Sequence, residues 1–140
     1  MRRTIVVAMQ IVMAIAFGAP AIAAESCPVS ESAVEKAGGY GNAVTALVNA
    51  ASTCERAYET LRICQLGSSG DNALSNIVAS KCEPLFLGKA RPATRATYKA
   101  AQARCNTIAE KNQGTMYQGL AAVCRAKAAR DLARKTAGKL

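Results

Sequence analysis

Apolar residues recur along the chain at steps of three and four, the spacing that places them on one face of a helix. Runs rich in glycine, proline, serine and asparagine interrupt this spacing. The interruptions fall at residues 38–41, 67–70, 88–92 and 112–114. Between them the pattern predicts helices over residues 30–37, 42–66, 71–82, 93–112 and 115–136, with a short turn at 84–87.

Residues that favour helix starts agree with these breaks. The stretches 32–35 and 115–118 fit the capping box, in which two side chains bond the free N–H groups of a first helical turn. Asn42 and Asp71 are suited to the N-cap position, and Gly114 is suited to closing the preceding helix. The pattern therefore predicts an all-α protein, a small helical bundle of about four to five helices.

The N-terminal residues 1–24 have the layout of a secretory signal peptide. Arg2 and Arg3 form a positive start, an apolar run follows over residues 5–17, and small residues at 21–24 offer a cleavage site. This apolar run is shorter than the roughly 20 residues that a membrane-spanning helix needs. We therefore predict a cleaved signal peptide, a single domain over residues 25–140, no permanent membrane span, and a periplasmic or secreted location.

Six cysteines follow the predicted signal peptide: Cys27, Cys54, Cys64, Cys82, Cys105 and Cys124. An even number of cysteines in a small exported chain indicates a disulfide framework. Two helices that fold back about a turn bring equidistant residues together, so Cys105 and Cys124 are the best pair. For the others, symmetry allows either a Cys54–Cys82 pair or the pairs Cys27–Cys54 and Cys64–Cys82. Without histidine or a CxxC motif, we expect neither a metal site nor a cofactor.

Charge separates the two halves of the chain. The whole sequence has 18 Lys and Arg against 9 Asp and Glu, a formal net charge of +9. Residues 25–83 hold 4 basic and 7 acidic residues, whereas residues 84–140 hold 12 basic and 2 acidic ones. A basic face attracts anionic partners. Seven residues are candidates for an anion-binding face on the C-terminal helices: Arg91, Arg95, Lys99, Arg104, Arg125, Arg130 and Arg134. Such a face would meet anionic lipid, lipopolysaccharide or glycan; the alternative is a solvated face that only keeps the protein in solution.

Motifs for catalysis are missing from the sequence, so we do not expect an enzyme. The chain has no histidine, no nucleophile motif and no glycine-rich phosphate loop. Glu55 and Glu59 share a helix face, but the nearby Arg56 and Arg62 favour a salt-bridged surface over a pair of catalytic acids. Nucleic acid is also a poor candidate partner, because only 4% of the residues are aromatic and none alternate with the basic residues for base stacking.

The C-terminal half carries one further pattern. Gln102 precedes Cys105 on a predicted helix, a turn of four residues follows, and Cys124 then begins an arginine-rich stretch. The turn consists of Gly114, Thr115, Met116 and Tyr117. This pattern resembles the end of the LprI-type lysozyme-inhibitor domain, although the tryptophan that follows the glutamine in that family is missing here. The resemblance implies a helical, disulfide-held envelope protein that binds a protein partner, a lysozyme-like muramidase.

The net charge of the chain bears on the hypothesis that it binds a lysozyme. Common c-type lysozymes are strongly basic, and a basic partner would approach them against electrostatic repulsion. The more acidic N-terminal half could still make the contact. Its candidate carboxylates are Glu31, Glu35, Glu55, Glu59, Asp71 and Glu83.

Overall fold

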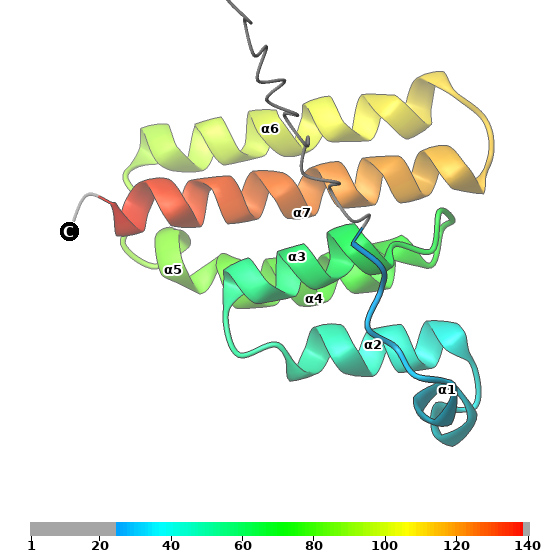
Figure 1. Cartoon of the computed structure of the whole chain (residues 1–140). Coiled ribbons are helices and arrows are strands. Elements are labelled where there is room, and N and C mark those ends of the chain that lie inside the picture. The colour runs from blue at the N-terminus through cyan, green and yellow to red at the C-terminus, as the bar shows by residue number, and fades with distance from the viewer. Residues whose placement is uncertain (1–24, 139–140) are drawn as a thin grey trace, which may run out of the picture.

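A computed structural model describes residues 25–138, and every regular element in that range is an α-helix. The helices are α1 (Glu31–Ala37), α2 (Tyr40–Ala50), α3 (Cys54–Cys64), α4 (Asp71–Cys82), α5 (Pro84–Leu87), α6 (Pro92–Lys111) and α7 (Thr115–Ala137) (Figure 1). The predicted all-α class is thereby confirmed. The predicted signal peptide lies outside the described residues. Among the described helices, none has the length and apolar character needed to cross a membrane.

The predicted helix over residues 42–66 is wrong, because the chain breaks at residues 51–53 and forms α2 and α3 instead. Ala51 is extended, with φ −61° and ψ 124°. Thr53 then caps α3, since its hydroxyl accepts a hydrogen bond from the Arg56 N–H at 3.1 Å. The apolar spacing continues through this break, so periodicity alone does not reveal it.

The predicted helix starts are displaced by up to three residues. Ser30 caps α1 in place of Ser32, and its hydroxyl accepts a hydrogen bond from the Ala33 N–H. Asn42 lies inside α2, and Thr115 is the first residue of α7 rather than its cap. Glycines hold these N-cap positions, so neither predicted side-chain cap forms.

The last helix, α7, packs against α3, α4, α5 and α6. In Figure 1 it runs alongside α6 and above α3 and α4. Its inward face consists of small residues, all of them buried: Gly119, Ala121, Ala122, Ala126, Ala129 and Ala133. Opposite them lie larger buried side chains, including Leu61 of α3 and Leu74 and Val78 of α4. Short side chains on α7 allow its backbone to lie close to its neighbours, and larger ones on α3 and α4 fill the space.

Three disulfides join Cys27 to Cys64, Cys54 to Cys82, and Cys105 to Cys124. The last is the pair that hairpin symmetry predicts, and of the two alternatives the structure has the one with Cys54–Cys82. The break before α3 explains this choice. Cys54 begins α3 and Cys64 ends it, so the two residues lie roughly 15 Å apart along the helix axis. They therefore contact different parts of the chain. Because α3 and α4 are antiparallel, the start of α3 meets the end of α4.

The loop between α3 and α4 closes on the buried side chain of Asp71. Its carboxylate accepts hydrogen bonds from the N–H groups of Leu66, Gly67 and Ser68, at 2.7, 2.9 and 3.3 Å. The same loop lies against Gly119 of α7. A Cβ atom on Gly119 would stand 2.7 Å from the Ser68 carbonyl oxygen and 2.8 Å from Asp71 Oδ2. Gly119 is therefore required for α7 to approach the loop.

Replacing this glycine tests the contact. We expect Gly119→Ala to lower the free energy of unfolding by about 1–3 kcal/mol, because the added methyl group overlaps backbone atoms that cannot move independently. The measurement is urea unfolding of the oxidised protein. Gly41→Ala is the matched control, because it lies in α2 and its Cβ would meet only Leu66 Cδ1 at 3.8 Å. The explanation fails if both variants are as stable as the unchanged protein.

Candidate anion-binding surface

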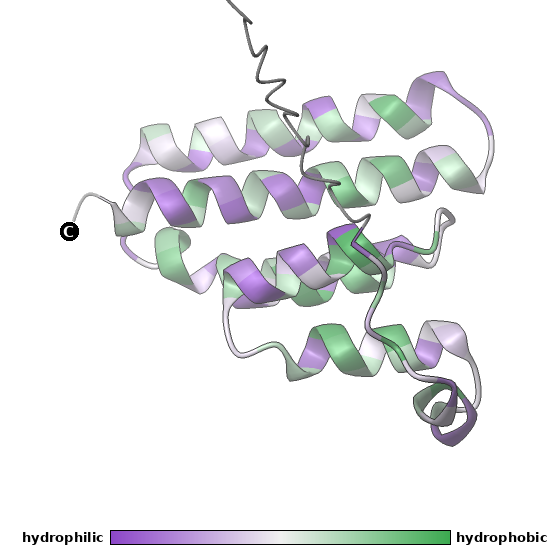
Figure 2. Ribbon diagram, in the orientation of Figure 1, coloured by the Kyte–Doolittle hydropathy of each residue, from purple (hydrophilic) through white to green (hydrophobic). Residues whose placement is uncertain are grey.

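The seven predicted anion-binding residues do not form one face. Figure 2 shows hydrophilic residues recurring along α6 and the C-terminal part of α7. These residues do not share the same neighbours. Arg125 and Arg130 are bonded inside the bundle. The other five remain exposed.

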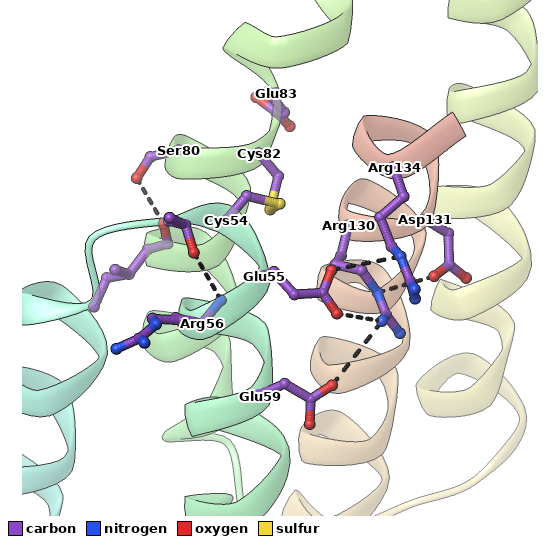
Figure 3. The surroundings of a disulfide bond; sticks show 12 residues. Cys54, Glu55, Arg56, Glu59, Ser80, Cys82, Glu83, Arg130, Asp131 and Arg134 are labelled. Carbon is purple, nitrogen blue, oxygen red and sulfur yellow. Dashed lines mark hydrogen bonds and ion pairs between the residues drawn. A yellow bond between two sulfur atoms is a disulfide. The ribbon is translucent and has the colours of Figure 1, made fainter. Parts of the chain in front are cut away.

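Arg130 is the most buried of the seven, with 8% of its surface exposed. Its Nη1 donates a hydrogen bond to Glu55 Oε1 at 2.9 Å, and its Nε lies at ion-pair distance, 2.9 Å, from Asp131 Oδ1. The guanidinium carbon lies 4.2 Å from the centre of the Tyr58 ring, a cation–π contact. Figure 3 shows the guanidinium between Glu55 and Asp131. Arg130 therefore fastens α7 to α3 and is not free to bind an anion.

Arg125 is bonded in a similar way. Its guanidinium donates to the side-chain oxygens of Asn106 and Asn72, at 2.9 and 2.5 Å. These contacts join α7 to α6 and to α4. Gln102 adds a weaker link between α6 and α7, donating to the Arg125 carbonyl oxygen at 3.4 Å.

The acidic candidates are mostly engaged as well. Glu55 pairs with Arg130, and Glu59 accepts a hydrogen bond from Arg62 at 2.6 Å. Glu55 and Glu59 therefore belong to ion pairs, as the sequence predicts. The main partner of Glu55 is nonetheless Arg130 and not the neighbouring Arg56. This partner lies 75 residues away in the chain, so no local spacing signals it.

Two further acidic candidates also have internal partners. The Asp71 carboxylate is buried in the α3–α4 loop. Glu83 accepts a hydrogen bond from the Tyr98 hydroxyl at 2.8 Å. Burial first, and then this hydrogen bond, raise the pKa of Tyr98 above its usual value, so the phenol stays protonated. Glu31 and Glu35 on α1 are exposed and make no ion pair within the described part of the chain.

One group of exposed cations lies where α5, the start of α6 and the end of α7 meet, near the C-terminus in Figure 1. We call this surface the basic end and define it by Lys89, Arg91, Arg95, Arg134 and Lys135. Arg95 donates a hydrogen bond to the Leu87 carbonyl oxygen at 2.6 Å, which holds its guanidinium beside α5. Arg134 has a longer approach to Glu55, 3.7 Å, and its side chain is 64% exposed.

A hollow of about 490 Å³ opens at the basic end. Its lining includes Leu85 and Phe86 from α5, Lys89 and Arg91 from the following segment, and Thr136 from α7. No carboxylate lines it. The hollow thus combines an apolar side with two cations.

A second hollow, of about 310 Å³, lies between α6 and α7 beside the Cys105–Cys124 disulfide. Arg104, Lys127 and Lys135 line it, together with Asp131, which pairs with Lys127 at 2.7 Å. Arg104 follows Lys99 by five residues, which rotates it by roughly 140° around α6. The predicted α6 face is therefore divided between two flanks of the helix, and the second flank is partly neutralised by Asp131.

The predicted turn at residues 114–117 joins α6 and α7. Gly114 has φ 115°, which side-chain-bearing residues rarely adopt, and it precedes the first residue of α7. Thr115, Met116 and Tyr117 form the first turn of that helix. Met116 is 53% exposed, so this end of the bundle presents an apolar side chain away from the basic end.

No family model, curated protein or solved structure matches this chain. Within residues 25–138 no group of three metal-ligating side chains comes together.

The role of Arg130 is open to a direct test. We expect Arg130→Ala to lower the free energy of unfolding by about 2–4 kcal/mol, because it removes the closest partner of Glu55 and the guanidinium that packs on the Tyr58 ring. The matched control is Arg134→Ala, one turn further along α7, which should change the free energy by less than about 0.5 kcal/mol. Thermal and urea unfolding measure both. Equal effects of the two variants would contradict the assignment of Arg130 as the fastening residue.

Proposed function

We propose that this protein is an exported binding protein that associates with an anionic surface of the cell envelope through the basic end. The observation that carries the proposal is the hollow that Lys89 and Arg91 line and that no carboxylate lines. Arg95 is held beside α5 by its hydrogen bond to Leu87, and Arg134 and Lys135 lie at the adjoining end of α7. Lipid phosphates, lipopolysaccharide and acidic glycans all carry the negative charge that such a surface attracts.

Export is supported by the disulfides. All six cysteines are paired and none is free. Disulfides persist in oxidising compartments and are rare where thiols are kept reduced. Together with the signal peptide predicted from the sequence, this supports a periplasmic or secreted location.

Ion pairs within the protein reduce the attraction of some of the other cations for an external anion. Arg130 pairs with Glu55, and Lys127 pairs with Asp131, whereas Lys89 and Arg91 make no ion pair among the described residues. Cations without such partners retain their attraction for an external anion. The association should therefore depend on a few residues and not on net charge alone.

Vesicle binding tests the proposal. We expect the oxidised protein to sediment with vesicles rich in phosphatidylglycerol and not with vesicles of phosphatidylcholine. The double variant Lys89→Gln/Arg91→Gln should bind about 25-fold more weakly, since each cation near an anionic surface contributes about fivefold. Raising the ionic strength to about 0.15 M should weaken the binding of the unchanged protein.

The control for this experiment has the same net charge. Lys36→Gln/Arg56→Gln removes two exposed cations from α1 and α3, away from the basic end. Its vesicle binding should stay within about twofold of the unchanged protein. If it loses as much affinity as the Lys89/Arg91 variant, net charge alone explains the binding. If phosphatidylcholine vesicles bind equally well, the proposal is wrong.

A second proposal follows from the resemblance to the LprI-type domain, namely inhibition of a lysozyme-like muramidase. The observation that favours it is the exposed acidic pair Glu31 and Glu35 on α1, which has no internal partner among the described residues. It ranks second because Glu55, Glu59, Asp71 and Glu83 are all engaged within the bundle.

A turbidity assay of cell-wall lysis separates the two proposals. Inhibition of lysozyme that persists at about 0.15 M salt, and is lost in Glu31→Gln/Glu35→Gln, would support the inhibitor. Inhibition at low salt only, unchanged in that variant and lost in Lys89→Gln/Arg91→Gln, would show that the protein coats the anionic wall. Reduced and alkylated protein is the control for folding. Absence of inhibition in every condition removes that lysozyme as the target.

A further inference from the structure

The short helix α5 presents one apolar side chain to the outside. Phe86 is buried and packs edge-to-face on Tyr98, with ring centres 5.0 Å apart. Leu87 is half-buried against the core. Leu85, between Pro84 and Phe86, is 57% exposed, the largest exposed fraction among the large apolar side chains described.

The fold holds Leu85 in this position from both sides. Cys82, just before α5, is buried and bonded to Cys54 of α3. After α5, the Leu87 carbonyl oxygen accepts the hydrogen bond from Arg95 of α6. Because Phe86 occupies the adjacent core position, Leu85 cannot turn inward without displacing it.

Cations border this leucine. Leu85, Lys89 and Arg91 line the same hollow, and no carboxylate lines it. An aliphatic side chain flanked by unpaired cations matches the interface of an anionic bilayer, where phosphates overlie hydrocarbon. A soluble acidic glycan offers the charge but no apolar layer, so it would leave Leu85 in water.

We propose that α5 is the membrane-contacting element of this protein: Leu85 enters the acyl layer of an anionic phospholipid bilayer while Lys89 and Arg91 contact lipid phosphates. This inference rests on the proposed function and adds the element and the lipid class. The long stems of Lys and Arg allow their charged ends to stay at the phosphate level while an adjacent apolar group lies deeper.

The other large exposed apolar side chains lie elsewhere. Met116 and Leu120 belong to the first turns of α7, and Tyr40 begins α2. Met116 precedes Lys135 of the basic end by 19 residues on one helix, roughly 28 Å. With 53% of its surface exposed, Met116 is a matched reference for Leu85.

The absence of tryptophan from the whole sequence allows a direct test. Leu85→Trp and Met116→Trp each introduce a single tryptophan at an exposed position, so neither disturbs the core. We expect the fluorescence of Leu85→Trp to shift to shorter wavelength with phosphatidylglycerol vesicles, and to be quenched by bromine atoms placed on the acyl chains. Met116→Trp should show neither change. In a third variant, Leu85→Ala should weaken vesicle binding by about tenfold at fixed salt.

Co-sedimentation in parallel separates the possible failures. If Leu85→Trp binds vesicles but keeps its aqueous emission, the proposed function stands and insertion by α5 is overturned. A shift in Met116→Trp and not in Leu85→Trp also overturns it, because the opposite end then meets the bilayer. If the unchanged protein binds lipopolysaccharide or an acidic glycan but no phospholipid vesicle, the lipid class is wrong. If it binds no anionic surface at all, both proposals fall.

Discussion

The small residues on α7 are the constraint on which the arrangement of charge depends. A seam of glycine and alanine lets α7 lie against α3, α4 and α6, and at Gly119 there is no room even for a methyl group. The cations of α7 are therefore placed at the edges of the seam or at its C-terminal end. The seam also explains the role of Gly119, where the helix meets the loop that Asp71 closes. Close packing and the placement of the α7 cations thus have one cause.

Arg130 is the exception to this rule, and its surroundings show why it is tolerated. Burying a guanidinium costs free energy unless opposite charge lies close to it. Glu55 supplies an opposite charge from α3, Asp131 supplies another from α7, and the Tyr58 ring covers one face. The cluster joins the first half of the bundle to its last helix. Glu55 of the acidic N-terminal half thereby binds Arg130 of the basic C-terminal half. Fewer carboxylates then remain available for a basic partner.

Sequence periodicity predicts most of the helices because each stripe of apolar residues faces the core. It misses the break at residues 51–53, because the apolar spacing continues from α2 into α3 although the chain changes direction there. In the sequence only Thr53, the N-cap of α3, indicates the break. Hairpin symmetry predicts Cys105–Cys124 because one short turn joins α6 and α7, whereas the pairing of Cys54 depends on that missed break. Charge patterning cannot tell Arg130 from Arg91, because the partner that buries Arg130 is distant in the chain. Leu85 and Phe86 are adjacent apolar residues in the sequence, and only the structure shows that Phe86 is buried and Leu85 is exposed.

A surface contact of few residues is effective only if those residues are already in place. Ordering a flexible loop at a membrane would cost conformational entropy for each residue fixed. The segment that carries Leu85 avoids much of this cost, since the Cys54–Cys82 disulfide anchors its start and the Tyr98–Glu83 and Arg95–Leu87 hydrogen bonds join it to α6. Figure 3 shows how the disulfide joins the ends of two helices beside Glu83. The same bonds that stabilise a small bundle therefore present one apolar side chain among cations in a fixed geometry, which is the arrangement that membrane contact requires.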